Sequence, residues 1–275
     1  MKRVWNYMAT TCKHAFLILW GVIAFVPFLW VTISAFKDNQ AIFTTPFSLP
    51  ASWSVENFAE AWEGAKVGVY FMNSIVIAII TMAAQILVVA MATYALTRLM
   101  RANRLASFFS IGLMIPIHAM LIPNFLTIRN LGLMNTRTGI ILVYMAANIS
   151  FGVFLLSGFM QGIPRELDEA AMIDGAGYLR VFFSVLLPVC KPGLATVGTF
   201  GFLNAWNEFL FASVLLTKQE NMTLTEGINY LKGQYVTDYG LLCAGLLFAI
   251  VPVVIMYILL QEQVVKGMTA GAVKG

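Results

Sequence analysis

The stretch YFMNSIVIAIITMAAQILVVAMATYALT, residues 70–97, contains no charged residue. An α-helix of about 20 apolar residues crosses the roughly 30 Å hydrocarbon core of a bilayer, so this stretch is long enough to span a membrane. The whole chain has the same character, since 60% of its 275 residues are hydrophobic and 11% are charged, with a mean hydropathy of +0.82. A soluble domain carries about 25% charged residues. We therefore predict an all-α, polytopic membrane protein.

Similar apolar runs recur along the chain and predict six transmembrane helices within a single membrane domain, residues 1–275. The predicted spans cover about residues 15–36, 70–97, 106–126, 139–160, 193–216 and 240–261. The first run is longer than the apolar core of a secretory signal, and no A-x-A cleavage site follows it. We expect it to stay in the membrane as a helix.

The distribution of Lys and Arg predicts the orientation of these spans. An even number of spans places both termini on one side, and cytoplasmic segments carry the excess of basic residues. Of the 17 Lys and Arg, eleven fall in segments on the side of the termini and six in segments on the other side. We therefore expect both termini to be cytoplasmic, together with the loop of about residues 161–192 between the fourth and fifth spans.

The remaining composition excludes several classes of function. The net charge of +4 is dispersed along the chain without a basic block, so we expect no nucleic-acid partner. The three cysteines lie far apart without metal-ligand spacing, which predicts no metal site. The sequence has no H-E-x-x-H, G-x-S-x-G or G-x-x-x-x-G-K-[ST] motif. We expect neither an enzyme nor a bound cofactor, and any ATP chemistry must come from a partner.

The predicted cytoplasmic loop differs from the rest of the chain because four acidic residues gather near its start. These residues are Glu166, Asp168, Glu169 and Asp174. Acidic side chains favour the first turn of a helix, Pro164 suits a helix start, and Gly175 suits a helix end. We predict a helix over residues 165–174.

A second short helix is predicted from Tyr178 to Leu187, with a stop at Pro188 and Pro192. The apolar positions of the first helix do not form a stripe wide enough to bury it in its own protein. The residues alone leave two interpretations open. The loop is either a solvated helical hairpin or an element that docks onto a cytoplasmic partner.

The segment EAAMIDGAGYLRVFFSVLLP, residues 169–188, resembles the EAA loop of ATP-binding-cassette importer permeases. The pattern of that loop is E-A-A, three residues, G, nine residues, and I-x-L-P. The matching positions are Glu169, Ala170, Ala171, Gly175, Leu187 and Pro188. Val185 stands where Ile is usual. The segments LMIPIHAMLIPNF, NAWNEFLF and VKGMTAGAVKG are similar to the carbohydrate-uptake branch, in particular to the second permease of the maltose and multiple-sugar type.

The resemblance implies a transport subunit of a bacterial inner membrane. Its implied partners are a sister permease in a heterodimer, a dimeric ATP-binding-cassette ATPase that binds ATP and Mg²⁺, an extracytoplasmic sugar-binding protein, and a sugar or polyol solute. The solute could be a mono-, di- or oligosaccharide, or glycerol phosphate.

The resemblance also implies roles for the loop residues. The segment of residues 165–177 would hold the coupling helix, which ends at Asp174 and sits in a groove of the ATPase. Glu169 would offer its carboxylate to a basic group there, while Ala170 and Ala171 would allow a close approach. Gly175 would supply a positive φ at the helix exit. Leu187 and Pro188 complete the loop pattern, and Pro188 would pass the motion into the fifth span.

Candidates for the solute path are polar residues inside the predicted spans, because such groups usually face a bundle interior or a cavity. In the fifth span they are Asn204, Trp206, Asn207 and Glu208. Asn204 and Glu208 are four residues apart and are expected on one helix face. The alternative role of this group is a helix-to-helix hydrogen-bond lock that holds the permease pair together.

In the third span, the candidates for the solute path are His118 and Asn124. Pro116 and Pro123 are expected to break or kink the helix beside them, which would free backbone groups to line a path. The rival function is a proton-coupled secondary transporter that uses Glu208 as its proton site. Against it, the chain has neither further buried acids nor two similar halves.

Overall fold

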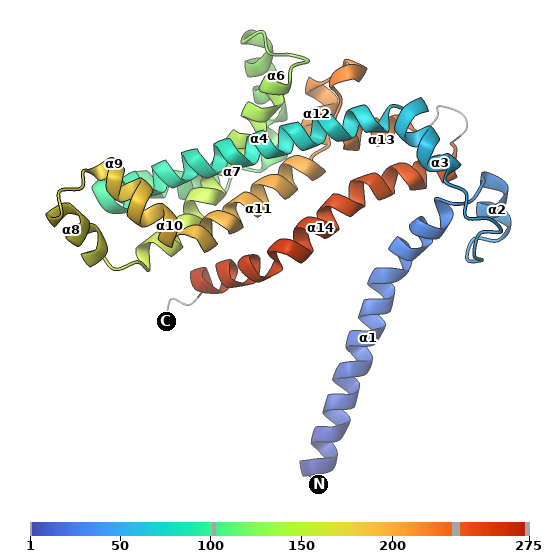
Figure 1. The fold of residues 1–275 in the computed structure, drawn as a ribbon, viewed down its shortest axis with the longest axis horizontal. Helices are drawn as coiled ribbons and strands as arrows, with labels where there is room; N and C mark the ends of the chain where they lie inside the picture. Colours follow the sequence, from blue (N-terminus) through green and yellow to red (C-terminus); the bar gives the residue numbers. More distant parts are fainter. Residues whose placement is uncertain (1, 101–102, 233–236, 273–275) are drawn as a thin grey trace. The chain divides into compact units, whose positions relative to one another are not determined.

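The computed structural model of the protein describes residues 2–100, 103–232 and 237–272, and every regular element in these ranges is helical (Figure 1). The all-α prediction is confirmed. Contacts between residues divide the chain into two compact units, Met1–Gly68 with Ile228–Ile250, and Val69–Gly227 with Val251–Gly275. The assignment of residues 1–275 to a single domain stays a prediction.

Four segments of the described chain are uninterrupted helices long and apolar enough to cross a membrane. They are Thr10–Ser34 in α1 (Lys2–Ser34), Val67–Leu99 in α4 (Val67–Tyr94) and the π-helical turn η2 (Ala95–Leu99), all of α7 (Arg137–Gln161), and Tyr239–Glu262 in α14 (Tyr239–Ala272). They coincide with the predicted first, second, fourth and sixth spans. A fifth crossing results if the helical segments Tyr178–Val189 and Lys191–Asn207, which meet at 79°, count as one bent span.

In the first unit, α1 exposes its apolar side chains along most of the candidate span, and its last turn is partly buried. Three short helices follow it, α2 (Asn39–Thr44), α3 (Glu56–Ala59) and the π-helical turn η1 (Glu60–Gly64). Asp38 begins α2 because its carboxylate accepts a hydrogen bond from the Ala41 N–H at 2.7 Å.

The predicted third span, residues 106–126, is wrong as a single helix. Helix α5 (Asn103–Gly112) is followed by a break, the 3₁₀ turn η3 (Ile117–Met120) and α6 (Leu121–Asn130). Pro116 has φ −61° and ψ 122°, so the expected break is confirmed there. Pro123 does not break α6, because it lies in the first turn of that helix. The N–H groups of a first turn have no partner within the helix, so the N–H that proline lacks is not missed there. The prediction of six uninterrupted transmembrane helices is therefore wrong for the described part of the chain.

The predicted fifth span, residues 193–216, is interrupted as well. Helix α11 (Lys191–Asn207) stops at Glu208, whose ψ of 131° is extended, and α12 (Leu210–Leu215) starts after it. The chain then continues through the 3₁₀ turn η5 (Gln219–Asn221) and α13 (Leu224–Tyr230).

Helices α4, α7 and α11 form the packed body of the second unit (Figure 1). Gly152 of α7 lies against Val89 of α4 and Val197 of α11, and Gly198 of α11 lies against Ile86 of α4. Small residues at such positions let membrane helices approach closely, where packing rather than the hydrophobic effect holds them together. The three helices therefore pack closely, with side chains of one helix against the glycine backbone of another.

Gly152→Ala is expected to destabilise the isolated chain by about 1–3 kcal/mol, because overpacking a tight core has this cost. The added Cβ would lie 2.7 Å from Cγ2 of the buried Val89, and a β-branched side chain in a helix strongly prefers one rotamer. Thermal unfolding of the purified chain in detergent measures the change.

Gly21→Ala is the matched control for this substitution. A Cβ at Gly21, on the exposed face of α1, meets nothing within 4 Å, so the substitution should be neutral or stabilise the helix by up to about 1 kcal/mol. Equal effects of the two substitutions would contradict the tight packing at Gly152.

Candidate functional site

The acidic segment forms helix α8 (Glu166–Ile173), which is shorter than the predicted 165–174 helix because Asp174 is already the C-terminal cap. Gly175 has φ +82°, as predicted for the helix exit. The Gly175 N–H donates to Met172 O at 3.0 Å, and the Ala176 N–H donates to Ala171 O at 2.9 Å. This pair of bonds is a Schellman motif, which satisfies the last carbonyls and turns the chain sharply.

Helix α8 has one face toward its own protein and one face toward solvent. Asp168 is buried and Ala171 packs half-buried against the core, three residues apart on the inner face. Glu169 and Ala170 are exposed, and Ile173 is 86% exposed. Of the two adjacent alanines of the pattern, Ala170 is exposed to an outside partner, whereas Ala171 is half-buried against its own protein.

The predicted second helix does not stop at Pro188. The chain runs through α9 (Tyr178–Val181), the π-helical turn η4 (Phe182–Leu186) and α10 (Leu187–Val189) before it bends. A proline ring normally clashes with the carbonyl four residues earlier. Here the Leu187 N–H bonds to Phe182 O, five residues back, and this wider turn makes room for the ring.

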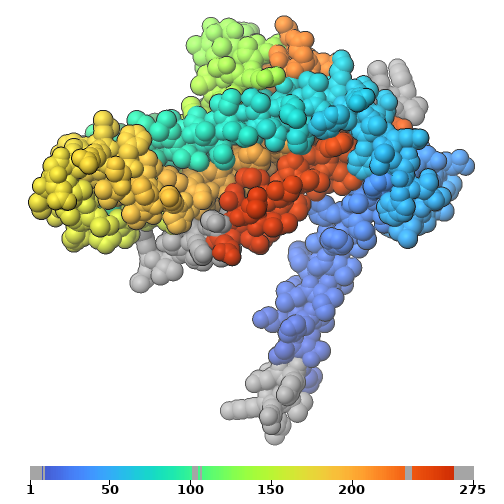
Figure 2. Space-filling view, viewed as in Figure 1, coloured from blue at the N-terminus to red at the C-terminus, as the bar shows by residue number. Residues whose placement is uncertain are grey.

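The loop segment of residues 165–189 is built into the hydrophobic core of the second unit. Val181, Phe182 and Leu186 are buried in one cluster with Leu156 of α7 and Val89 of α4. Leu187 packs partly buried against this cluster, whereas Pro188 is exposed. The segment forms the yellow end of the unit in Figures 1 and 2. Helix α8 joins this cluster through Ala171, which packs partly buried against it.

Sequence reasoning missed one feature of this segment, a buried ion pair. Asp168 Oδ2 lies 3.4 Å from Nε of Arg98, at the end of α4, and the two side chains are 10% and 6% exposed. In the sequence, Asp168 is one of four similar acids, and Arg98 belongs to a basic turn, "RLMRANR", whose Arg101 lies outside the described residues. The three-residue spacing from Asp168 to Ala171 was the one local signal for an inner face.

Two polar residues of the predicted fifth span, Asn204 and Glu208, form hydrogen bonds to α7 rather than to each other. Asn204 Nδ2 donates to Asn148 Oδ1 at 2.6 Å, and Tyr144 Oη donates to Glu208 Oε2 at 2.7 Å. The expectation that Asn204 and Glu208 share a helix face is wrong, because α11 ends at Asn207 and Glu208 is extended. Each of them instead links α11 to α7 within one chain.

Glu208 also supplies hydrogen-bond acceptors to the first turn of the next helix, α12. Its Oε1 accepts from the Phe211 N–H at 2.8 Å, its Oε2 accepts from the Ala212 N–H at 3.1 Å, and its carbonyl accepts from Thr225 Oγ1 at 2.8 Å. Inside a membrane the free N–H groups at a helix start need partners, and this carboxyl group supplies them.

The other candidates for the solute path differ in how accessible they are. The Trp206 side chain is 1% exposed, and its ring lies against Phe202 and Phe71, with ring centroids 5.8 and 5.6 Å away. In this conformation it has no free face for a sugar. Asn207 is exposed, although its Nδ2 donates to Leu203 O at 2.9 Å.

In the segment of η3 and α6, His118 is exposed and Asn124 is half-buried. The structure does not bring these two together with Asn204 or Glu208 through any hydrogen bond among the described residues. Their role in a solute path stays a prediction.

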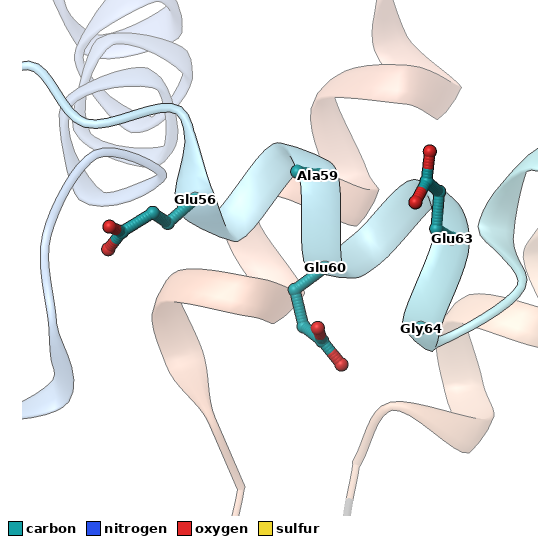
Figure 3. Close-up of a pocket in the computed structure, with 5 residues that line it drawn as sticks. All are labelled: Glu56, Ala59, Glu60, Glu63 and Gly64. Atoms are coloured by element: carbon teal, nitrogen blue, oxygen red, sulfur yellow. The ribbon is translucent and has the colours of Figure 1, made fainter.

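An open hollow of about 580 Å³ lies on α3 and η1, lined by acidic side chains and small residues. In Figure 3 the carboxyl groups of Glu56, Glu60 and Glu63 point in different directions and do not converge on a common centre. Among the described residues, no group of three or more His, Cys, Asp and Glu side chains is arranged to hold a metal ion. This hollow therefore has no feature of a binding site beyond its shape.

The segment that follows α12 is fastened to α4 and α7. Asn73 Nδ2 donates to Glu220 O and Met222 O at 2.9 Å each, and Arg137 Nη2 donates to Asn73 Oδ1 at 2.7 Å. On α13, burial raises the pKa of Glu226. Polar contacts thus join this segment to α4 and α7.

Comparison with known proteins places the chain in a family. Residues 100–269 match the family model described as binding-protein-dependent transport system inner membrane component. The chain belongs to this family. The permease is 41% identical over 263 residues to the diacetylchitobiose uptake system permease protein NgcG of Streptomyces coelicolor, across 94% of this chain and 87% of that protein. It is 32% identical over 268 residues to the maltodextrin transport system permease protein MdxG of Bacillus subtilis, across 96% of each.

A solved structure has the same fold. The permease superposes on a chain of a bacterial ABC transporter involved in the import of the acidic polysaccharide alginate, with a TM-score of 0.82 and 22% identity. The match covers 94% of this chain and 96% of that chain. The permease is thus a multi-pass inner-membrane subunit of an ABC importer and not an enzyme, and ATP is bound by its ATPase partner. The alternative function, that of a proton-coupled secondary transporter, is therefore wrong.

Proposed function

We propose that the permease forms half of the translocation path of an ATP-driven sugar importer and takes up the movement of its ATPase through α8. The observation that carries this proposal is the family match over residues 100–269, together with relatives named for uptake of diacetylchitobiose and maltodextrin. The solute is a sugar or a related polyol delivered by an extracytoplasmic binding protein.

The outer face of α8 supports its role as the contact with the ATPase. Glu169 and Ala170 are exposed side by side, and Glu169 makes no ion pair with the described residues. A free carboxylate beside a small residue suits a groove that offers a basic group, where a charge-assisted hydrogen bond forms as water leaves. Ile173, 86% exposed, adds an apolar contact at the end of the same face.

The path of movement from α8 leads through α10 into α11. The helical segments Tyr178–Val189 and Lys191–Asn207 meet at 79°, so a push on the first segment turns the second. Leu187 packs against the core at this corner, and Pro192 lies in the first turn of α11, where a proline fits a helix. We assign Leu187 and Pro188 to this corner and Asp174 and Gly175 to the exit of α8.

The membrane arrangement that this function requires has six crossings, with the termini and residues 161–192 in the cytoplasm. The broken segment of α5, η3 and α6 would supply the third crossing. Its freed backbone groups and His118 then face the sister permease, because broken helices are tolerated in membranes where protein or a water-filled cavity covers them. The sister permease is a different chain that closes the path.

We place the solute path along the exposed side of α11 and the broken segment. Asn204 and Asn207 are exposed three residues apart, so they lie on one side of α11 and can reach sugar hydroxyls. Asn124 and His118 are the corresponding groups of the broken segment. Glu208 serves as a lock between α7, α11 and α12, since its carboxyl oxygens are already occupied.

The proposed function is tested in proteoliposomes that contain the permease, its sister permease, the ATPase and the binding protein. We expect uptake of labelled diacetylchitobiose or maltodextrin only with internal ATP and binding protein, and no ATP hydrolysis by the permease alone. Uptake driven by a proton gradient without ATP would overturn the proposal. Uptake of neither sugar, with ATP-dependent uptake of another class of solute, would overturn the sugar assignment alone.

A further inference from the structure

Arg98, in the π-helical turn at the end of α4, contacts both α7 and α8. Its Nη2 donates to Met160 O at 2.7 Å and to Ile163 O at 2.8 Å, so it caps the C-terminal end of α7. Its Nε lies 3.4 Å from Asp168 Oδ2 on the inner face of α8. One side chain therefore joins the ends of α4 and α7 to the coupling helix.

The burial of this pair is costly and needs a reason. Removing two charges from water costs several kcal/mol per ion, and an apolar pair of similar volume is often equally stable. The start of α8 does not depend on Asp168, because Glu166 and Glu169 already place acidic charge in its first turn. The pair is therefore better explained by the position it gives α8 than by the stability it adds.

The ion pair is also incompletely bonded. Nε of Arg98 and Oδ1 of Asp168 are buried without a hydrogen-bond partner among the described residues. Unsatisfied buried polar groups are uncommon in folded proteins, so this pair is not arranged for stability alone.

Two further contacts join the same elements beside the ion pair. Tyr94 Oη donates to Tyr178 O at 3.1 Å, and the rings of Tyr94 and Phe182 lie 5.2 Å apart between centroids. Arg165, before α8, donates from Nη2 to Thr97 O at 3.1 Å. These contacts lie at or beside two π-helical turns, Ala95–Leu99 and Phe182–Leu186, a type of turn frequent at functional sites.

We propose that Arg98 and Asp168 are a positioning pair that makes α4 and the end of α7 follow α8 when the ATPase moves it. This inference rests on the proposed function, in which α8 receives that movement. The pair adds a second route of transmission to the one through α10 and α11. The charge of Asp168 is what draws α4 along, and Arg98 carries α7 because it caps that helix.

Distances between spin labels in the reconstituted complex test the two proposals separately. Cys12, Cys190 and Cys243 are replaced by Ala, and exposed positions are labelled in pairs, Leu167 on α8 with Met91 on α4, and Leu167 with Leu126 on α6. Distances are compared without nucleotide and after trapping with ATP and vanadate. We expect the Leu167–Leu126 distance to shift and the Leu167–Met91 distance to stay the same.

The variants then ask whether the ion pair is responsible. In Asp168→Asn we expect the Leu167–Met91 distance to shift on trapping, because α8 moves without α4. The double variant R98M/D168L buries no unpaired charge, so it should assemble and show the same shift. Lys191→Met, which removes an exposed cation, is the control and should behave as the parent protein.

Each outcome is decisive for one proposal. A Leu167–Leu126 distance that does not change in the parent protein overturns the role of α8 in the proposed function. A Leu167–Met91 distance that shifts in the parent protein, or stays fixed in the double variant, overturns the role of the ion pair, because packing alone would then decide how α4 moves. A shift limited to Asp168→Asn and the double variant supports it.

Discussion

Glu169→Lys is expected to abolish ATP hydrolysis stimulated by binding protein and solute. The side chain is exposed on the outer face of α8 and is free to meet the ATPase. Two like charges forced together in a contact without water cost several kcal/mol. A loss of about 3 kcal/mol weakens the contact by roughly two orders of magnitude, since 1.4 kcal/mol corresponds to a factor of ten. Phosphate release by the reconstituted complex measures the effect.

A graded series separates loss of charge from general damage to α8. Glu169→Asp keeps the charge and should retain most of the stimulation. Glu169→Gln keeps one neutral acceptor oxygen, replaces the other with an NH2 donor, and should fall between Asp and Lys. All three complexes should contain folded permease, because the position is exposed and surface substitutions change stability by about 0.5 kcal/mol or less. Full stimulation with Glu169→Lys would show that the carboxylate is dispensable for coupling.

The features of the loop segment of residues 165–189 that follow from local chemistry could be predicted from the sequence. Acids in the first turn and a glycine at the exit are effects of the helix itself, and the structure has both, with φ +82° at Gly175. The stop at Pro188 was wrong because the rule for proline assumes an α-helical turn before it. The π-helical turn Phe182–Leu186 removes that clash, and it is held by core packing that no local pattern encodes.

The features that depend on contacts between distant segments could not be read from the sequence. Which of the four acids faces inward depends on how α8 is rotated, and the packing of Ala171 and Ala176 against the core decides this. The break at Glu208 has the same origin. The segment NAWNEFLF has neither Gly nor Pro, so its periodicity suggests a continuous helix, whereas Tyr144 and Thr225 hold Glu208 in an extended conformation.

Glu208→Ala is expected to destabilise the chain by about 3–5 kcal/mol, a magnitude reached when a buried network is broken. The substitution removes the acceptors of three hydrogen bonds, from Tyr144 Oη and from the N–H groups of Phe211 and Ala212. Hydrogen bonds to a charged group contribute about 1.5–3 kcal/mol each, and the donors left behind lie where the bilayer offers no water. Thermal unfolding in detergent, followed by the fraction of monodisperse protein, measures the loss.

Tyr144→Phe removes only one of these bonds and keeps the ring, so it should cost about 1–3 kcal/mol, clearly less than Glu208→Ala. In the double variant the cost should be smaller than the sum of the two single costs, because both substitutions delete the same bond. If Glu208 only links the helices, the folded fraction of the Tyr144→Phe variant should transport the same solutes as the parent protein. If Glu208→Ala were as stable as the parent protein but changed which sugar is taken up, Glu208 would belong to the solute path and the lock would be wrong.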